Sequence, residues 1–114
     1  MQAASLTRLA EELLADARAA ASGRSARTIV GGHDRTLRQT LIALAAGHHL
    51  DEHETPGDAT LHVLHGQVRM ATATDAHDAV TGDLLVVPDA RHSLEALADS
   101  AVLLTVAKGT RPGT

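Results

Sequence analysis

The chain has 114 residues, a net charge of −4 at pH 7, no cysteine and no phenylalanine, tyrosine or tryptophan. This length suits one domain with a modest core. The lack of cysteine excludes disulfides and thiolate ligands and fits a cytoplasmic protein. The lack of aromatic rings removes the stacking platforms for bases, and the arginines are scattered, so we expect no nucleic-acid binding. No apolar run approaches the roughly 20 residues that span a membrane, so we expect no membrane insertion.

Residues 1–23 predict one amphipathic helix. Three acidic residues lie among its leucines, which argues against a signal peptide. Ser5 or Thr7 is placed to cap its start, and Gly23 is placed to end it in the left-handed conformation. One helical face carries Leu6, Leu9, Leu13, Ala17 and Ala20. Such a short helix is marginal alone, so we expect this face to pack on a sheet or on a dimer partner.

Residues 24–110 predict an all-β unit, and residues 111–114 a frayed tail. The expected strands cover residues 25–30, 36–45, 59–65, 68–72, a short segment around Val80, 84–87, 92–97 and 101–107. Short strands separated by glycine or proline, with no second helix, indicate an antiparallel barrel or jelly roll. Residues 41–44 are apolar on both faces, which predicts cover on both sides of that strand.

The stretch of residues 47–66 contains five of the eight histidines and four acidic residues. Imidazole and carboxylate groups bind first-row metals and move protons near neutral pH. The functional end of the molecule is therefore expected here.

Two ordered motifs surround this stretch. Gly47, His53 and Gly66 form the first, and Gly82, Pro88 and His92 form the second. Together they resemble the two motifs of the cupin superfamily, small RmlC-like barrels, over about residues 36–107. The resemblance implies an antiparallel jelly-roll barrel with one N-terminal helix, in which His53 and His92 approach each other inside the barrel.

The metal set of the family is incomplete in this sequence. The resemblance implies two histidines and a glutamate in the first motif, but Thr55 and Ala59 stand where the second histidine and the glutamate are expected. His53 and His92 alone make a poor site, since zinc and non-haem iron sites use at least three protein ligands. A divalent metal (Zn, Fe, Mn or Ni) would need a third ligand, for which the candidates are His48, His49 and Glu54.

Three functions remain open. The first is the binding of a small molecule in the barrel, with or without a sensing or regulatory role. Its expected lining is apolar, with His53, His92 and Gln39 as polar groups, and consists of Leu41, Ala43, Leu61, Val63 and Leu85. The second is a metal-dependent enzyme, an oxygenase or isomerase, with a rearranged site around His53 and His92. The third is a structural or interaction module that dimerises through the helix and residues 41–44. A homodimer is expected under all three.

Overall fold

The computed structural model describes residues 1–54 and 57–109, and for His53 only the backbone. The helix is α1 (Leu6–Ala19). The strands are β1 (Arg24–Val30), β2 (Leu37–Leu44), β3 (His49–His53), β4 (Gly57–His65), β5 (Gln67–Ala71), β6 (Ala76–Val80), β7 (Leu84–Val86), β8 (His92–Ala96) and β9 (Ser100–Lys108). The expected helix and strands are confirmed within one or a few residues, and β3 is an addition. The expected tail, residues 111–114, lies outside the described residues.

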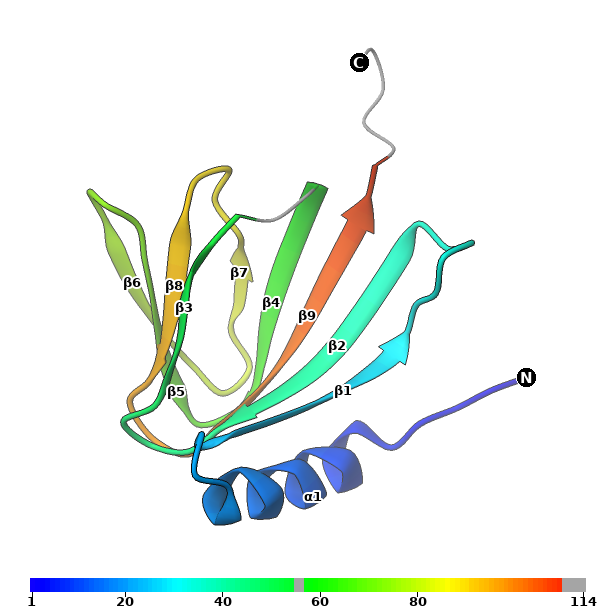
Figure 1. The fold of residues 1–114 in the computed structure, drawn as a ribbon, viewed down its shortest axis with the longest axis horizontal. Coiled ribbons are helices and arrows are strands. Elements are labelled where there is room, and N and C mark those ends of the chain that lie inside the picture. Colours follow the sequence, from blue (N-terminus) through cyan, green and yellow to red (C-terminus); the bar gives the residue numbers. More distant parts are fainter. Residues whose placement is uncertain (55–56, 110–114) are drawn as a thin grey trace.

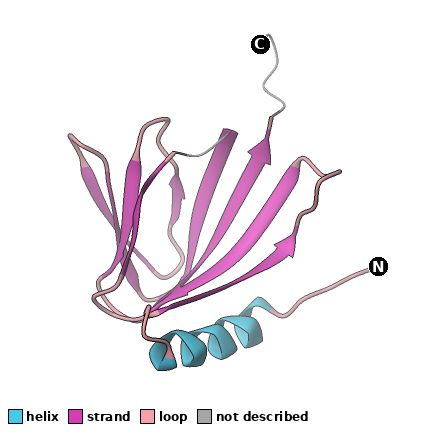
Figure 2. Ribbon diagram, in the orientation of Figure 1, coloured by secondary structure: helices cyan, strands magenta, loops and turns pink. Residues whose placement is uncertain are grey.

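The strands form two antiparallel sheets that face each other (Figures 1 and 2). One has the order β1-β2-β9-β4-β7 and the other the order β3-β8-β5-β6. Apart from β1–β2 and β5–β6, successive strands lie in different sheets, which gives the predicted jelly-roll barrel. In Figure 1 the sheets lie close at the end that carries the β4–β5, β6–β7 and β8–β9 turns, and they separate toward the opposite end. We call these the closed end and the open end.

Helix α1 lies across the outer face of the five-stranded sheet (Figure 2). Ser5 caps it, because its Oγ accepts a hydrogen bond from the Arg8 N–H at 3.3 Å. Its buried face packs against one side of β2 and β9. The helix contributes Ala10, Leu13, Leu14 and Ala17 to this cluster, and the strands contribute Leu41, Ala43 and Ala101. Gly23 has the expected positive φ of 68°, but it follows the C-cap residue Ala20 by three positions. Among the described residues no helix is long and apolar enough to cross a membrane.

The cover predicted for residues 41–44 comes from within the chain. Leu41 and Ala43 contact α1, whereas Leu44 and Ile42 belong to the core between the sheets. The expectation that this strand and the helix form a dimer contact is therefore wrong, because the helix already occupies the outer side of the strand.

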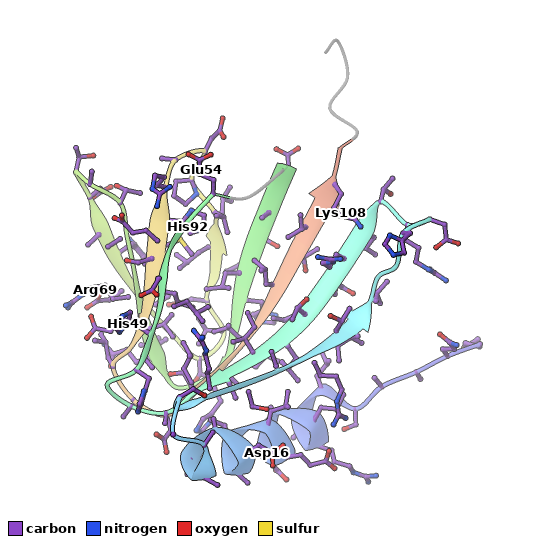
Figure 3. All side chains as sticks on the ribbon, in the orientation of Figure 1. Asp16, His49, Glu54, Arg69, His92 and Lys108 are labelled. Carbon is purple, nitrogen blue, oxygen red and sulfur yellow. The ribbon has the colours of Figure 1, made fainter. Side chains whose placement is uncertain are left out.

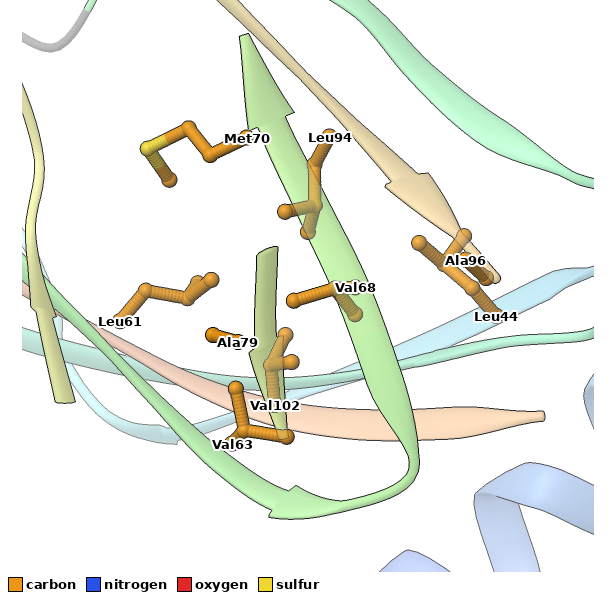
Figure 4. Packing of buried hydrophobic residues seen from close by; sticks show 9 residues of the cluster. All are labelled: Leu44, Leu61, Val63, Val68, Met70, Ala79, Leu94, Ala96 and Val102. Atoms are coloured by element: carbon orange, nitrogen blue, oxygen red, sulfur yellow. The ribbon is translucent and has the colours of Figure 1, made fainter. Parts of the chain in front are cut away.

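The core between the sheets is densest at the closed end (Figure 4). Leu44, Val63, Val68 and Val102 are each at most 1% exposed there, and they interdigitate with small side chains such as Ala79 and Ala96. Because the chain has no aromatic ring, this packing uses aliphatic residues alone.

Asp99 ties three segments together at the closed end. One carboxylate oxygen accepts a hydrogen bond from the Ala46 N–H at 2.8 Å, and the other accepts one from Arg18 Nε of α1 at 2.6 Å. The backbone hydrogen bond from Ala46, followed by that from Arg18, holds the pKa of Asp99 below its usual value. The carboxylate thus links the helix, the β2–β3 loop and the β8–β9 turn.

Candidate functional site

The inward positions of the barrel are unevenly buried toward the open end: Ala59 and Val106 are 6% and 5% exposed, whereas other positions are only partly buried. Strand register places Ile42 one inward position above Leu44, and Leu104 one inward position above Val102. In each pair the residue nearer the closed end, Leu44 or Val102, is buried, whereas the residue nearer the open end is only partly buried. Leu50, Leu85 and Val87 are also partly buried. Partly exposed apolar side chains that face inward indicate a pocket wall, because a filled core would bury them.

A hollow of about 460 Å³ opens beside this wall. It lies between the β5–β6 hairpin and β7 and is lined by Met70, Thr72, Thr74, Asp75, Ala76, His77, Leu85, Val86, Pro88 and Ala90. Met70 and Leu85 belong to or pack against the core between the sheets. The hollow therefore reaches the interior, and its volume falls in the range of small-molecule sites, about 300–1,000 Å³.

His92 begins β8 at the open end and is only 3% exposed (Figure 3). Its Nδ1 lies 2.8 Å from the Ala90 carbonyl oxygen. A carbonyl can only accept, so Nδ1 carries a proton and donates it to this hydrogen bond. Backbone register pairs His92 with His53, as the resemblance implied, while the side chain of His53 lies outside the described residues.

His77 lines the hollow but was not predicted as a site residue. It pairs with Met70 across β5 and β6, and Met70 pairs with Leu94 on β8. Directly opposed residues share a sheet face, so His77 faces inward and lines the hollow. The signal was present in the sequence, since Ala79 and His77 are two positions apart on one strand.

Part of the expected lining is confirmed as inward-facing and part lies on the wrong face. Leu61 and Val63 are in the core between the sheets, with Leu85 against it. Gln39 and Leu41 point to the outer side: Gln39 Nε2 donates to Thr105 Oγ1 at 3.2 Å, and Leu41 contacts α1, as Ala43 does. The alternation of side chains along β2 was predicted correctly. The face predicted to line the barrel is the outer one, because α1 covers it. The inward positions of β2 are those of Arg38, Thr40, Ile42 and Leu44.

The three candidates for a third metal ligand do not gather around His92. His48 lies at the closed end, where its ring is directly beside Gly23. His49 pairs with Glu95, and its Nε2 lies 3.2 Å from Asp51 Oδ1 on the outer face of β3. Figure 3 shows Glu54 at the same end as His92, and the Glu54 side chain is exposed.

The described residues do not fit the first-row metal that the cupin resemblance implies. Among them, no group of three His, Asp or Glu side chains is placed to hold an ion. Ala59, at the position of the family's glutamate, is buried and brings no donor atom. Thr55 and the side chain of His53 fall outside the described residues.

Comparisons with protein-family models and with curated protein sequences found no match. Solved structures do match. A protein of unknown function from Streptococcus pyogenes has 26% identity and a TM-score of 0.71, covering 81% of this chain and 80% of its own. A cupin superfamily protein from Desulfitobacterium hafniense has 22% identity and a TM-score of 0.69, covering 75% and 78%. The chain has the cupin fold.

A larger protein shares the same cupin fold. Salicylate 1,2-dioxygenase from Pseudaminobacter salicylatoxidans has 20% identity and a TM-score of 0.75, and the match covers 88% of this chain but 33% of the enzyme. A complex of a variant of that enzyme contains gentisate. At this identity the likeness concerns the fold alone, so the function has to be argued from the residues of the open end.

Proposed function

We propose that this cupin domain binds a small organic molecule in the open half of its barrel. One observation carries the proposal: inward-facing Ile42, Leu50, Leu85, Val87 and Leu104 remain partly exposed, and Leu85 also lines a hollow of about 460 Å³. An apolar wall with a few polar groups, here His92 and His77, is the usual form of a ligand site. A sensing or regulatory role in the cytoplasm would use this binding.

The test uses two neighbouring leucines of β7. Leu85 faces the hollow, whereas Leu84 points to the outer face. Salicylate, gentisate, salicylamide and hexanoate are titrated by calorimetry and by ligand-detected NMR. We expect saturable binding of at least one probe and a loss of about tenfold or more in Leu85→Phe, because the larger ring enters the hollow. Leu84→Phe serves as the control and should bind normally. Binding that Leu85→Phe leaves unchanged would place the site elsewhere.

We further propose that this binding needs no resident metal. The support is chemical: Ala59 supplies no ligand atom, and neither His48 nor His49 lies near His92. The alternative, a metal-dependent oxygenase or isomerase, requires a stoichiometric ion. Metal analysis of untagged protein purified without chelator, beside His92→Ala, separates the two. Stoichiometric metal that His92→Ala removes would favour the enzyme.

A homodimer remains a second candidate role, now on a different surface. Leu37, Leu84 and Val86 are 43%, 61% and 78% exposed, and all three lie on the outer face of the five-stranded sheet. Between β7 and β2, two rows of directly paired residues on that face carry no acidic residue, lysine or arginine. The first row consists of Val86, Thr60, Thr105 and Gln39, and the second of Leu84, His62, Leu103 and Leu41. Within these two rows a second copy would meet no like charge, and Asp58 lies in the next row, with Leu37 and Ala107.

Light scattering tests this surface. We expect a dimer that Val86→Arg converts to a monomer, because the charge would be buried in the interface. Val80→Arg is the matched control, since Val80 is exposed on β6 in the other sheet. A monomeric wild-type chain at micromolar concentration would exclude the dimer.

A further inference from the structure

The ionisable side chains of the regular strands are distributed unequally between the two faces: the outer faces carry carboxylates together with basic groups such as Arg27 and Arg69. Alternation and register direct five ionisable side chains inward, and all five are basic: Arg24, Arg38, His77, His92 and Lys108. The carboxylates of the same strands point outward: Asp58, Asp78 and Glu95. The segment after Leu50, where the register shifts, is outside this comparison. On the described strands outside that segment, the ionisable groups at inward positions are thus all basic, in a chain with a net charge of −4.

Four of the five inward basic groups belong to the open end. Arg24 pairs with Leu44 at the closed end, whereas Arg38 pairs with Val106 one inward position above Thr40. His92 and Lys108 are at the same open end (Figure 3). These basic groups therefore lie nearer the open end than the partly exposed apolar wall.

Arg38 is the group among them best suited to meet a ligand. It is exposed, and the described residues provide no ion pair for its guanidinium. Lys108, by contrast, is half-buried and its Nζ donates to the Gly32 carbonyl oxygen at 3.2 Å, which ties it to the β1–β2 turn. Lys108 contributes charge at the rim, while Arg38 keeps its five donors for another partner.

Acidic residues also occur at the open end. Asp34 and Glu54 lie on its loops and are exposed, and three others are engaged in local contacts or lie off the inner wall. Asp75 Oδ1 accepts from the Ala76 N–H at 2.9 Å within its own turn. Glu52 lies 4.0 Å from Arg91 Nε, and Asp89 lines a separate hollow beside Thr60 and Thr105 on the outer face. These three carboxylates do not neutralise the inward face of β2.

We propose that the small molecule bound by this barrel is a carboxylate. This inference rests on the proposed function and names its ligand class. The apolar body of the ligand would lie against Ile42 and Leu104, at the neighbouring inward positions of β2 and β9, and its carboxylate would meet the guanidinium of Arg38. A planar guanidinium binds a carboxylate through two parallel hydrogen bonds, and these are stronger than neutral ones.

The experiment compares carboxylates with amides of nearly the same shape. The probes are benzoate and benzamide, salicylate and salicylamide, and hexanoate and hexanamide. The chain has no aromatic residue, so the fluorescence of salicylate can be followed without a protein background. Calorimetry measures the remaining probes. We expect at least one carboxylate to bind about tenfold or more tightly than its amide, which is the size of a charge-assisted hydrogen bond.

Variants assign the preference to one side chain. Arg38→Gln should reduce the ratio between carboxylate and amide to about threefold or less, while the affinity for the amide stays constant. Arg38→Lys keeps the charge and should retain part of the ratio. Arg24→Gln makes the same change on the inner face at the closed end and should leave the ratio unaltered.

Each outcome decides between the two proposals. Equal binding of the two members of every pair, or a preference for the amides, would overturn the carboxylate inference and leave the binding function intact. No binding by any of the six probes would overturn both. A ratio that survives in Arg38→Gln and is lost in Lys108→Gln would remove Arg38 from the site.

Discussion

The two ends of the barrel are built from the same strands, yet one is packed and the other is open. On β2, Leu44 is fully buried and Ile42 is not, although both face inward. The sheets separate toward the open end, and the chain has no aromatic side chain to fill a wider space. Aliphatic residues reach across where the sheets are close, whereas toward the open end Ala59 and Val106 are still buried but Ile42 and Leu104 are not. The absence of aromatic residues therefore shapes the site as well as limiting its chemistry.

The two ends are expected to differ most in the stability lost when a large apolar side chain is shortened to alanine. Leu44→Ala should lower the free energy of unfolding by about 3 to 4 kcal/mol, because it leaves a cavity in a closed layer. Leu85→Ala removes a partly buried side chain beside an existing hollow and should cost about 1 kcal/mol. Urea denaturation followed by far-ultraviolet circular dichroism measures both, since the chain has no fluorescent side chain. Equal losses would mean that the open end is as well packed as the closed one.

A second contrast concerns the glycines of the turns at the closed end. Gly66 has a φ of 98°, and a Cβ there would collide with the Asp99 carbonyl oxygen and with Ser100. Gly82 has a similar φ of 94°, but nothing lies within 4 Å of its Cβ position. Gly82→Ala should cost about 1 to 2 kcal/mol from backbone strain alone.

Gly66→Ala adds the collision to that strain and should cost about 2 to 3 kcal/mol. The same denaturation experiment compares the two variants. If both lost the same stability, the β8–β9 turn would have moved aside at little cost, and the closed end would be less rigid than its burial indicates.

The sequence was sufficient for most of the fold because its signals were local. Ser5 capped the helix as expected, and glycine at position 66 marked a tight turn. The strand β3 was missed because it is an edge strand, whose sequence HLDEH contains one apolar residue, Leu50. Because Leu50 is the one apolar residue of this strand, no alternation of apolar and polar residues was visible.

The site was harder to derive, because inside and outside are set by packing between distant segments. The face of β2 that carries Gln39 and Leu41 is apolar enough to line a barrel, and α1 uses it instead. The other face carries Arg38 and Ile42, whose importance depends on where the opposing sheet ends. No local pattern in the sequence contains that information.

A smaller effect is expected for the carboxylate that fastens the closed end. The pKa of Asp99 is lowered in the folded state, so its contribution is present above the usual value near 4 and is lost as the pH falls through the folded value. Asp99→Asn should cost about 1 kcal/mol at neutral pH, because water screens a partly exposed ion pair. The difference from wild type should shrink below about pH 4. Asp16→Asn, on the same helix that supplies Arg18, is the control; a constant difference down to pH 3 would contradict the assignment.

The smallest stability effect is expected at the residue with the largest proposed role in binding. Arg38→Gln should change the free energy of unfolding by less than about 0.5 kcal/mol, because the side chain is exposed and makes no ion pair within the described residues. Denaturation of the variant without ligand measures this. A loss above about 1 kcal/mol would show that Arg38 supports the fold, and its effect on carboxylate binding would then lose its direct interpretation. An unchanged stability beside a reduced preference for carboxylates would separate the two ends completely: the closed end holds the barrel together, and the open end selects the ligand.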